Sequence, residues 1–417
     1  MSASSILSEM SVQLADKALF EQARKYAFAY MDSVPQRRVF PDDLAIEALS
    51  AFDEPLPQRP QSGIETLQIL HDIGSPATVA QTGGRYFGFV NGNAVPTAVA
   101  ARWLSDVWDQ NAALNVMSPV AAKLEQVCER WVRELLGLPD ETVMGLVGGT
   151  SVATMCGLAA GRYALLRRLG WDVNADGLFG APPIRVVVSE HAHGAVFKAL
   201  ALLGLGKNRV ELVPADSQGR MDPDQLPDLD ARTLLILQAG NVNTGAFDDF
   251  DQLCSRARDA GSWAHIDGAF GLWAAVSPNH AQLTAGMEQA NSWSVDGHKT
   301  LNTPYDCGII LCQDRDALVA SMQASGGYLQ YSDARDNMLF TPDMSRRARA
   351  VELWATLRYL GQPGMAELID GLCARATQFS MELSEHGFTV LNDVVFNQVL
   401  VTCDSDAQTE ATLSLIH

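Results

Sequence analysis

The sequence predicts an α/β protein whose large domain holds a mostly parallel, seven-stranded sheet covered by helices. Short apolar, β-branched runs recur from about residue 143, helix-length segments separate most of them, and several runs end in polar residues where the chain turns. The strand-like runs are residues 143–147, 184–189, 210–213, 233–237, 262–266, 292–295 and 308–311. The expected helices between them include residues 151–168, 194–205 and 250–260. Such alternation is typical of parallel sheets with helices on both faces.

The flanking segments differ from this central pattern. The first 60 or so residues are expected to form amphipathic helices at 12–31 and 44–52, which end at a proline-rich break. After residue 318 the pattern changes to long helices at 345–360 and 365–386, then short strands at 388–390 and 398–401. We therefore predict an N-terminal helical arm that dimerises (1–80), a large domain (81–325) and a small α+β C-terminal domain (326–417). The chain stops at His417 at the apparent start of a helix, so we expect that small domain to be incomplete.

Composition narrows the class of protein. The formal net charge of −19 argues against nucleic acid and anionic membrane surfaces as partners, because both would be repelled. The seven cysteines are scattered without a C-x-x-C pair, which favours reduced thiols over disulfides or a zinc site. Neither a signal peptide nor a membrane-spanning run is expected. These features predict a cytoplasmic protein with no membrane partner.

A carboxylate and an amine follow two neighbouring strand-like runs. Asp267 ends an apolar run, and Lys299 follows the next one. Ligands collect at the carboxyl ends of strands in open α/β sheets. A desolvated lysine there is a common site of Schiff-base chemistry, and a buried aspartate needs a partner such as a protonated pyridine nitrogen. Taken singly, Asp267 could be a helix N-cap and Lys299 a surface residue; together they predict an enzyme built around pyridoxal 5′-phosphate.

Two further segments fit such a cofactor. Thr150 and Ser151 follow a glycine pair at a strand-to-helix turn, where backbone N–H groups and hydroxyls can bind phosphate, although ordinary helix capping gives the same pattern. His193 follows another strand and could stack on a planar ligand or relay protons, although a single histidine is more often structural. His191 lies close to it, but no acidic or cysteine partner completes a metal shell, so no metal site is expected.

Taken in order, these motifs resemble those of the pyridoxal-phosphate-dependent group II amino-acid decarboxylases, which act on aromatic amino acids, glutamate or diaminobutyrate. The resemblance extends from about residue 85 to about residue 360. It implies the aspartate-aminotransferase-like fold, known as fold type I, and a homodimer with active sites at the subunit interface. It also implies decarboxylation of an L-amino acid to the corresponding amine and CO2.

The resemblance assigns roles to matching residues. It makes Lys299 the Schiff-base lysine, Asp267 the partner of the pyridine nitrogen and His193 the residue stacked on the ring. Tyr328 and Tyr331 are the candidates for a proton-donating tyrosine on a mobile loop. The remaining expected cofactor contacts are Thr150, Ser151, Asn241, Asn243, Ala269, Ser294 and His298.

Some positions depart from the family pattern. Thr300 follows the lysine where tryptophan is common, and Val152 replaces a frequent glutamate. Residues 111–115 lack the aromatic side chains expected for an aromatic substrate. Other fold type I reactions therefore remain open, namely those of a carbon–carbon lyase, a desulfurase or an aminotransferase. A non-catalytic relative that binds the cofactor also remains open, because fold does not fix reaction.

Overall fold

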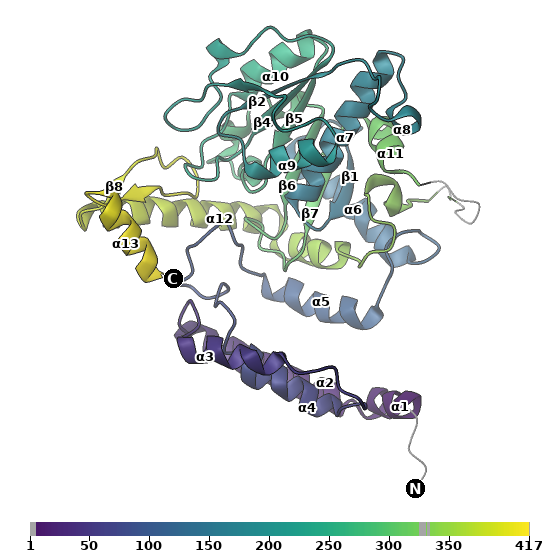
Figure 1. The fold of residues 1–417 in the computed structure, drawn as a ribbon, viewed down its shortest axis with the longest axis vertical. Coiled ribbons are helices and arrows are strands. Elements are labelled where there is room, and N and C mark those ends of the chain that lie inside the picture. The colour runs from purple at the N-terminus through teal and green to yellow at the C-terminus, as the bar shows by residue number, and fades with distance from the viewer. Residues whose placement is uncertain (1–5, 325–330, 332–333, 417) are drawn as a thin grey trace. The chain divides into compact units, whose positions relative to one another are not determined.

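The computed structural model describes residues 6–324, 331 and 334–416 (Figure 1). By compactness the chain divides into two units, one formed by Val90–Thr409 and the other by Met1–Phe89 with Glu410–His417. The predicted division into arm, large domain and small domain stays a prediction.

The larger unit is built on a seven-stranded sheet. Its order is β1-β7-β6-β5-β4-β2-β3; β7 runs antiparallel to β1 and β6, and the other neighbours are parallel. The strands are β1 (Val143–Val147), β2 (Arg185–Ser189), β3 (Glu211–Val213), β4 (Thr233–Gln238), β5 (Trp263–Asp267), β6 (Ser292–Asp296) and β7 (Gly308–Cys312). All seven predicted strands are present, and the mostly parallel α/β architecture is confirmed.

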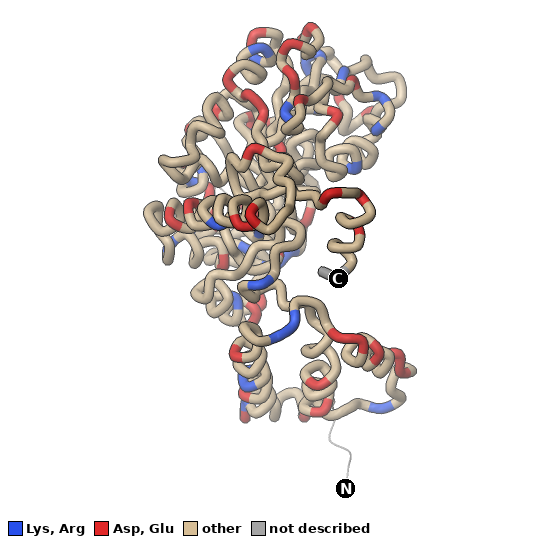
Figure 2. The backbone as a smooth tube through the Cα atoms, turned by 90° about the vertical axis from the view of Figure 1, so that its left-hand side faces the viewer, with Lys and Arg blue, Asp and Glu red and all other residues tan. Residues whose placement is uncertain are grey.

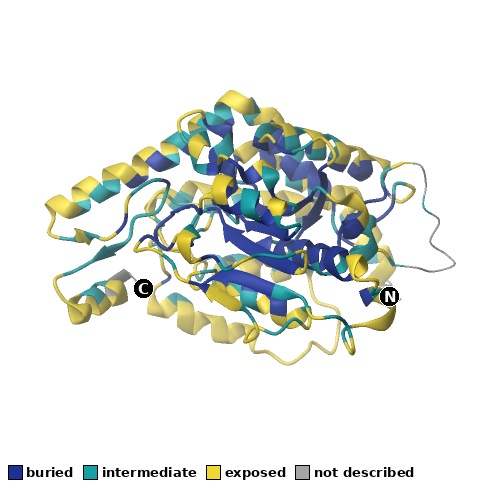
Figure 3. Cartoon of the chain, turned by 90° about the horizontal axis from the view of Figure 1, so that it is seen from above, coloured by how far each residue is buried: buried dark blue, intermediate teal, exposed yellow. Residues whose placement is uncertain are grey.

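Helices cover both faces of this sheet, and all strands except the edge strand β3 are largely buried between them (Figure 3). Alternate strand residues join different core clusters, as the two-residue period of a strand requires. Leu235 and Leu237 pack in the cluster with α6, α10 and α12, whereas Leu234 and Ile236 pack in the cluster with α7, α9 and α11. These helices are α6 (Pro119–Leu136), α7 (Thr150–Arg168), α9 (Gly194–Leu202), α10 (Phe250–Asp259), α11 (Arg315–Met322) and α12 (Ala350–Glu385).

The range of α12 contains two helical segments that meet at Gly361, as the sequence predicted. At Gly361 the φ and ψ angles are 60° and 175°, which α12 accommodates just before Pro363. The prediction placed two helices here with a Gly-Pro break; the first begins at Ala350, five residues later than expected. The remaining elements are α5 (Pro96–Trp108), α8 (Val173–Asp176), β8 (Thr389–Val390), β9 (Val401–Thr402) and α13 (Asp406–Ile416), which runs into the other unit.

The smaller unit contains the helices of the N-terminal segment. They are α1 (Ile6–Asp16), α2 (Ala18–Ser33), α3 (Asp43–Ala48) and α4 (Gly63–Ile69). The predicted helix at 12–31 is interrupted at Lys17, which has φ 60° and separates α1 from α2. No described residue of these four helices is buried.

Short helical turns complete the chain. The 3₁₀ turns are η1 (Val34–Gln36), η2 (Leu49–Phe52), η4 (Pro223–Gln225), η5 (Gly271–Val276), η6 (Ala281–Thr284), η7 (Met287–Gln289) and η8 (Asn337–Phe340), and η3 (Leu70–Gly74) is π-helical. Acidic and basic residues are interspersed along the helices and loops of each unit (Figure 2). Across the described part of the chain, no helix is both long and apolar enough to cross a membrane.

Candidate active site

The candidate site lies at the carboxyl ends of β5 and β6. These neighbouring strands are parallel, with Asp267 opposite Ser294, so the segments that follow β5 and β6 leave the sheet at the same edge. Asp267 ends β5, and Lys299 lies three residues beyond the end of β6. The turn that carries Lys299 is closed by hydrogen bonds from Thr303 N–H to the Gly297 carbonyl (2.9 Å) and from Gly297 N–H to the Cys307 carbonyl (2.8 Å). The two residues that the sequence singled out therefore leave the sheet side by side.

A cavity of about 270 Å³ opens at this edge. Seven residues expected to form the site line it: Thr150, Ser151, His193, Asp267, Ala269, His298 and Lys299. Gly148 and Gly149 of the glycine turn also line it, together with Ala195, Asp296 and Tyr305. The phosphate-type turn, the lysine and the aspartate thus share one cavity.

Asp267 is a buried acid. Its side-chain Oδ1 accepts a hydrogen bond from the Ala269 N–H at 3.2 Å, and the residue is 7% exposed. Burial raises the pKa of this carboxyl, while the positive charges of Lys299 and His193 act to lower it. Within the described residues its carboxylate makes no ion pair inside 4.0 Å. A buried carboxylate in this state is stabilised by any cation that enters the cavity.

Lys299 pairs with a second acid, Asp296. The lysine Nζ lies 3.3 Å from Asp296 Oδ2, and the His298 Nε2 lies 3.5 Å from the same oxygen. The Thr150 N–H donates to Asp296 Oδ1 at 2.7 Å, which joins the lysine turn to the start of α7. Burial lowers the pKa of His298, although Asp296 opposes that shift. The ring of His298 also contacts Tyr305, with 4.3 Å between centroids.

The start of α7 is suited to an anion. Thr150 is buried, and its Oγ1 has no hydrogen-bond partner among the described residues. The residue lines the cavity beside the exposed Ser151. Helix N-termini carry partial positive charge and bind phosphate readily. An unsatisfied buried hydroxyl is costly and would be relieved by a phosphate oxygen. Together with the lysine and the buried acid, these residues fit pyridoxal 5′-phosphate.

A glycine on the adjacent strand allows this turn to pack closely. A Cβ atom on Gly308, the first residue of β7, would lie 2.4 Å from the Gly149 Cα. The same construction on Gly149 itself meets nothing nearer than 3.5 Å. The close approach that shapes the turn therefore depends on Gly308, which the sequence alone did not identify.

His193 lies at the mouth of the site. It is the N-cap of α9, where Nδ1 accepts a hydrogen bond from the Ala195 N–H at 3.3 Å. Its side chain is exposed, and it lines both the main cavity and a smaller adjoining one that Asp267 also lines. This position is compatible with a contact to a planar ligand.

Four expected site residues have other surroundings. The Ser294 Oγ lies 2.9 Å from the Thr154 Oγ1 and 3.3 Å from the His265 Nε2, within the buried layer beneath α7. The Asn241 Oδ1 accepts hydrogen bonds from the backbone N–H groups of its own loop, including that of Asn243. The Tyr331 hydroxyl donates to the Ala324 carbonyl. None of these lines the main cavity. Tyr328 lies outside the described residues.

Two residues of the site were missed by sequence reasoning. Asp296 had the same signature as Asp267, a carboxylate at the end of an apolar strand, and could have been found by that signal. Tyr305 gave no comparable signal, because a lone aromatic residue after a proline is common in loops. Its hydroxyl donates to the Asn91 Oδ1 at 3.1 Å.

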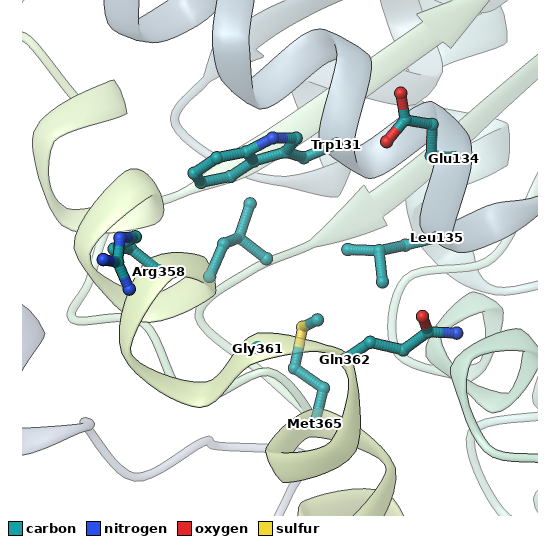
Figure 4. A pocket seen from close by; sticks show the side chains of 8 residues that line it. Trp131, Glu134, Leu135, Arg358, Gly361, Gln362 and Met365 are labelled. Carbon is teal, nitrogen blue, oxygen red and sulfur yellow. The ribbon is translucent and has the colours of Figure 1, made fainter.

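A second cavity, of about 350 Å³, lies between α6 and the kink of α12 (Figure 4). Trp131, Leu135, Leu357 and Met365 supply apolar walls, and Gly361 at the kink contributes backbone. None of the expected site residues lines this cavity, and it holds no described histidine, cysteine or lysine. The chemistry-bearing residues are therefore gathered in the cavity at the sheet edge.

Comparison with known proteins agrees with this geometry. Residues 49–402 match the family model described as the pyridoxal-dependent decarboxylase conserved domain. The chain is 28% identical over 317 residues to an acidic amino acid decarboxylase of Mus musculus, and 27% identical over 333 residues to an L-tyrosine/L-DOPA decarboxylase of Lophophora williamsii. These alignments cover 72% and 74% of this chain, but only 57% and 62% of the relatives' own lengths.

Two further matches cover a larger share of the matched proteins' own lengths. A phenylacetaldehyde synthase of Arabidopsis thaliana is 24% identical over 405 residues, which is 90% of this chain and 81% of that protein. The crystal structure of Catharanthus roseus tryptophan decarboxylase with L-tryptophan superposes with a TM-score of 0.82 at 19% identity, covering 100% of this chain and 90% of that one. The structural likeness shows a shared fold, and the predicted fold type I is confirmed.

Proposed function

The chain belongs to the pyridoxal-dependent decarboxylase family, and on this premise we propose that it removes the α-carboxylate of an amino acid as CO2, leaving the amine. The observation that carries the proposal is the shared cavity of Lys299, Asp267 and the Thr150 turn. The relatives named above include decarboxylases of acidic and of aromatic amino acids. The proposal therefore does not specify the substrate side chain, which the assay below identifies.

In this proposal the chain's residues bind and orient. The Thr150 and Ser151 hydroxyls and the start of α7 hold the phosphate, and the Lys299 amine anchors the aldehyde. Asp267 keeps a proton on the ring nitrogen, and His193 covers one face of the ring. When bound, pyridoxal phosphate supplies a conjugated ring that accepts electron density from the bond that breaks. The walls of the cavity hold the substrate carboxylate out of the plane of that ring, which selects the bond.

The test combines a spectrum with a product assay. Purified protein should show a visible absorption band from lysine-bound cofactor, and Lys299→Ala should lose it. Release of CO2 is then measured across a panel of single amino acids, with amines, keto acids and aldehydes identified by mass spectrometry. An unchanged band in Lys299→Ala would refute the lysine assignment. A keto acid without CO2 would indicate an aminotransferase instead.

A second candidate product follows from one relative. The phenylacetaldehyde synthase match extends over 90% of this chain, so an aldehyde is a specific alternative to the amine. Forming the aldehyde would consume dioxygen as the oxidant and would release the nitrogen as ammonia. The same assay separates the two, because both reactions would release CO2 but only one would leave an amine. Absence of bound cofactor and of any product would favour a non-catalytic relative.

A further inference from the structure

Asp296 is an acid where the bound anion is expected. Its Oδ1 already accepts the Thr150 N–H at 2.7 Å, and its Oδ2 lies 3.3 Å from the Lys299 Nζ. A Cβ atom on Gly149 would lie 3.7 Å from the same Oδ1, so the carboxylate contacts the glycine turn itself. The side chain is 3% exposed. Asp296 thus already binds the N–H group at the start of α7 and pairs with the Lys299 amine, the two groups that a phosphorylated aldehyde needs.

The carboxylate cannot withdraw easily, because the backbone of Asp296 is held on both sides. Its N–H donates to the Ala269 carbonyl at 2.9 Å, and its own carbonyl accepts the indole N–H of Trp273 at 2.8 Å. The residue also ends β6, with its neighbours paired in the sheet. Any ligand that reaches the start of α7 therefore meets this charge close by.

The described residues of one chain that line the cavity carry little positive charge. This described lining contains two carboxylates, Asp267 and Asp296, and one cation, Lys299. Burial lowers the pKa of His298, which disfavours the charged form of its ring. No arginine is among the described lining residues. A phosphate that enters must rely on the hydroxyls and N–H groups of α7 while it faces Asp296.

We propose that Asp296 competes with the cofactor's phosphate for the start of α7 and so sets a weak, readily exchanged hold on pyridoxal phosphate. The inference rests on the proposed function and concerns the same cavity. Asp296 is an affinity-setting residue in this account, because its charge acts on the phosphate and on the position of the Lys299 amine. Two like charges a few ångströms apart in a partly buried site repel strongly enough to change affinity by an order of magnitude.

The test compares wild type with Asp296→Asn, which keeps an oxygen acceptor for the Thr150 N–H and removes the charge. Equilibrium dialysis of the full chain measures the Kd of pyridoxal phosphate, of pyridoxal and of inorganic phosphate. We expect the Kd of pyridoxal phosphate to fall about tenfold or more and that of inorganic phosphate to fall as well. The Kd of pyridoxal, which lacks the phosphate, should change less than threefold.

Two controls make the result decisive. Asp314→Asn removes a carboxylate that caps α11 through the Ala317 N–H, away from the cavity, and should leave all three Kd values unchanged. Asp296→Ser supplies a second uncharged acceptor and should also lower the Kd of pyridoxal phosphate. It replaces the asparagine variant in the test if circular dichroism shows that Asp296→Asn folds poorly.

Several results would overturn the inference. Weaker or unchanged binding of pyridoxal phosphate by folded Asp296→Asn and Asp296→Ser would show that the charge does not oppose the phosphate. An equal gain for pyridoxal would show that the effect comes from the Lys299 amine alone. In both cases wild type would still bind the cofactor and the proposed function would stand. If wild type binds no pyridoxal phosphate, the proposed function fails and this inference fails with it.

Discussion

The Asp267 carboxylate is buried at the end of β5, and its residue-scale environment suits a positive ring nitrogen. Burial raises its pKa, so without a cation the charged form is disfavoured. Lys299 and His193 offset part of that cost. A protonated ring nitrogen would offset more, because it could lie against the carboxylate inside the cavity. The carboxylate and the cofactor are in this way expected to stabilise each other's charged forms.

Replacement of Asp267 by asparagine tests that relation. Asp267→Asn should still bind pyridoxal phosphate, but CO2 release per bound cofactor should fall by at least about 100-fold, or about 2.7 kcal/mol in barrier height, because a neutral amide cannot hold the ring nitrogen charged. Single-turnover CO2 release and cofactor absorbance measure the two quantities. Asp249→Asn, a change at the N-cap of α10, should leave both intact. Full activity in Asp267→Asn would contradict the assigned role.

Asp248 is expected to make the stability of the folded protein depend on pH. It is a buried acid whose oxygens accept the Met221 and Gln238 N–H groups, and burial raises its pKa to about 6. Because this pKa is raised in the folded state, folding favours the protonated form of Asp248. The contribution of Asp248 to the free energy of unfolding is therefore fully present at low pH and is lost as the pH rises through about 6. The window runs from the ordinary value near 4 to about 6, and the change is on the order of 3 kcal/mol.

The measurement for Asp248 is a pair of thermal unfolding series between pH 4 and 7.5. Wild type should lose stability relative to Asp248→Asn as the pH rises, because the amide does not titrate. The difference between their midpoints should change most between pH 4 and 6.5. Parallel midpoint curves would show that Asp248 does not titrate in this range.

Charged residues at strand ends show what sequence can predict at this scale. Asp267 and Lys299 were predictable because a charge beside an apolar run must have a partner. Asp296 carries the same signal, but its partner is the Thr150 N–H, 146 residues away in sequence. That contact depends on how β6 and α7 pack, and spacing along the chain does not reveal it. The Asn241 side-chain oxygen instead accepts hydrogen bonds from N–H groups two and three residues along its own loop, and its contact with the cofactor stays a prediction.

At the scale of elements, the strands were predicted most accurately. Apolar runs of five or so residues between turns are typical of strands buried on both faces, and β1 begins and ends where the sequence placed it. The helix predicted at 12–31 differs from the structure in two places. The first helix already begins at Ile6, and the left-handed conformation of Lys17 separates two helices without a glycine or proline to mark it. The antiparallel direction of β7 also has no signal in its own residues.

The close contact of β7 with the glycine turn predicts that a larger residue at Gly308 would destabilise the protein. Gly308→Ala should lower the free energy of unfolding by about 1–3 kcal/mol and weaken pyridoxal phosphate binding, because the new Cβ would displace Gly149 backbone. Gly371→Ala, inside α12, meets no atom within 4 Å and should be neutral or stabilising by up to about 1 kcal/mol. Thermal unfolding and cofactor dialysis measure both variants. Equal behaviour of the two would show that the turn tolerates the displacement.

At the scale of the whole molecule, the N-terminal helices bury no described residue, yet they carry many apolar side chains. In α1, Leu7, Met10 and Leu14 are 70%, 51% and 64% exposed, and their spacing of three and four residues places them on one face of the helix. An exposed apolar stripe of this kind is typical of an interface between proteins. We therefore expect a second copy of this chain to cover it, as the predicted homodimer requires.

Light scattering on a sizing column tests the dimer. Wild type should have the mass of two chains, and a variant with Leu7→Glu and Leu14→Glu should move toward one, because burying two added charges in an apolar interface is costly. Phe179→Glu is the matched control, since Phe179 is 98% exposed and belongs to the other unit, so this variant should stay dimeric. If the active site lies at the interface, the double variant should also lose bound pyridoxal phosphate as it dissociates. A double variant that keeps the mass of two chains would show that the α1 stripe is not the contact, and a monomeric wild type would exclude the homodimer itself.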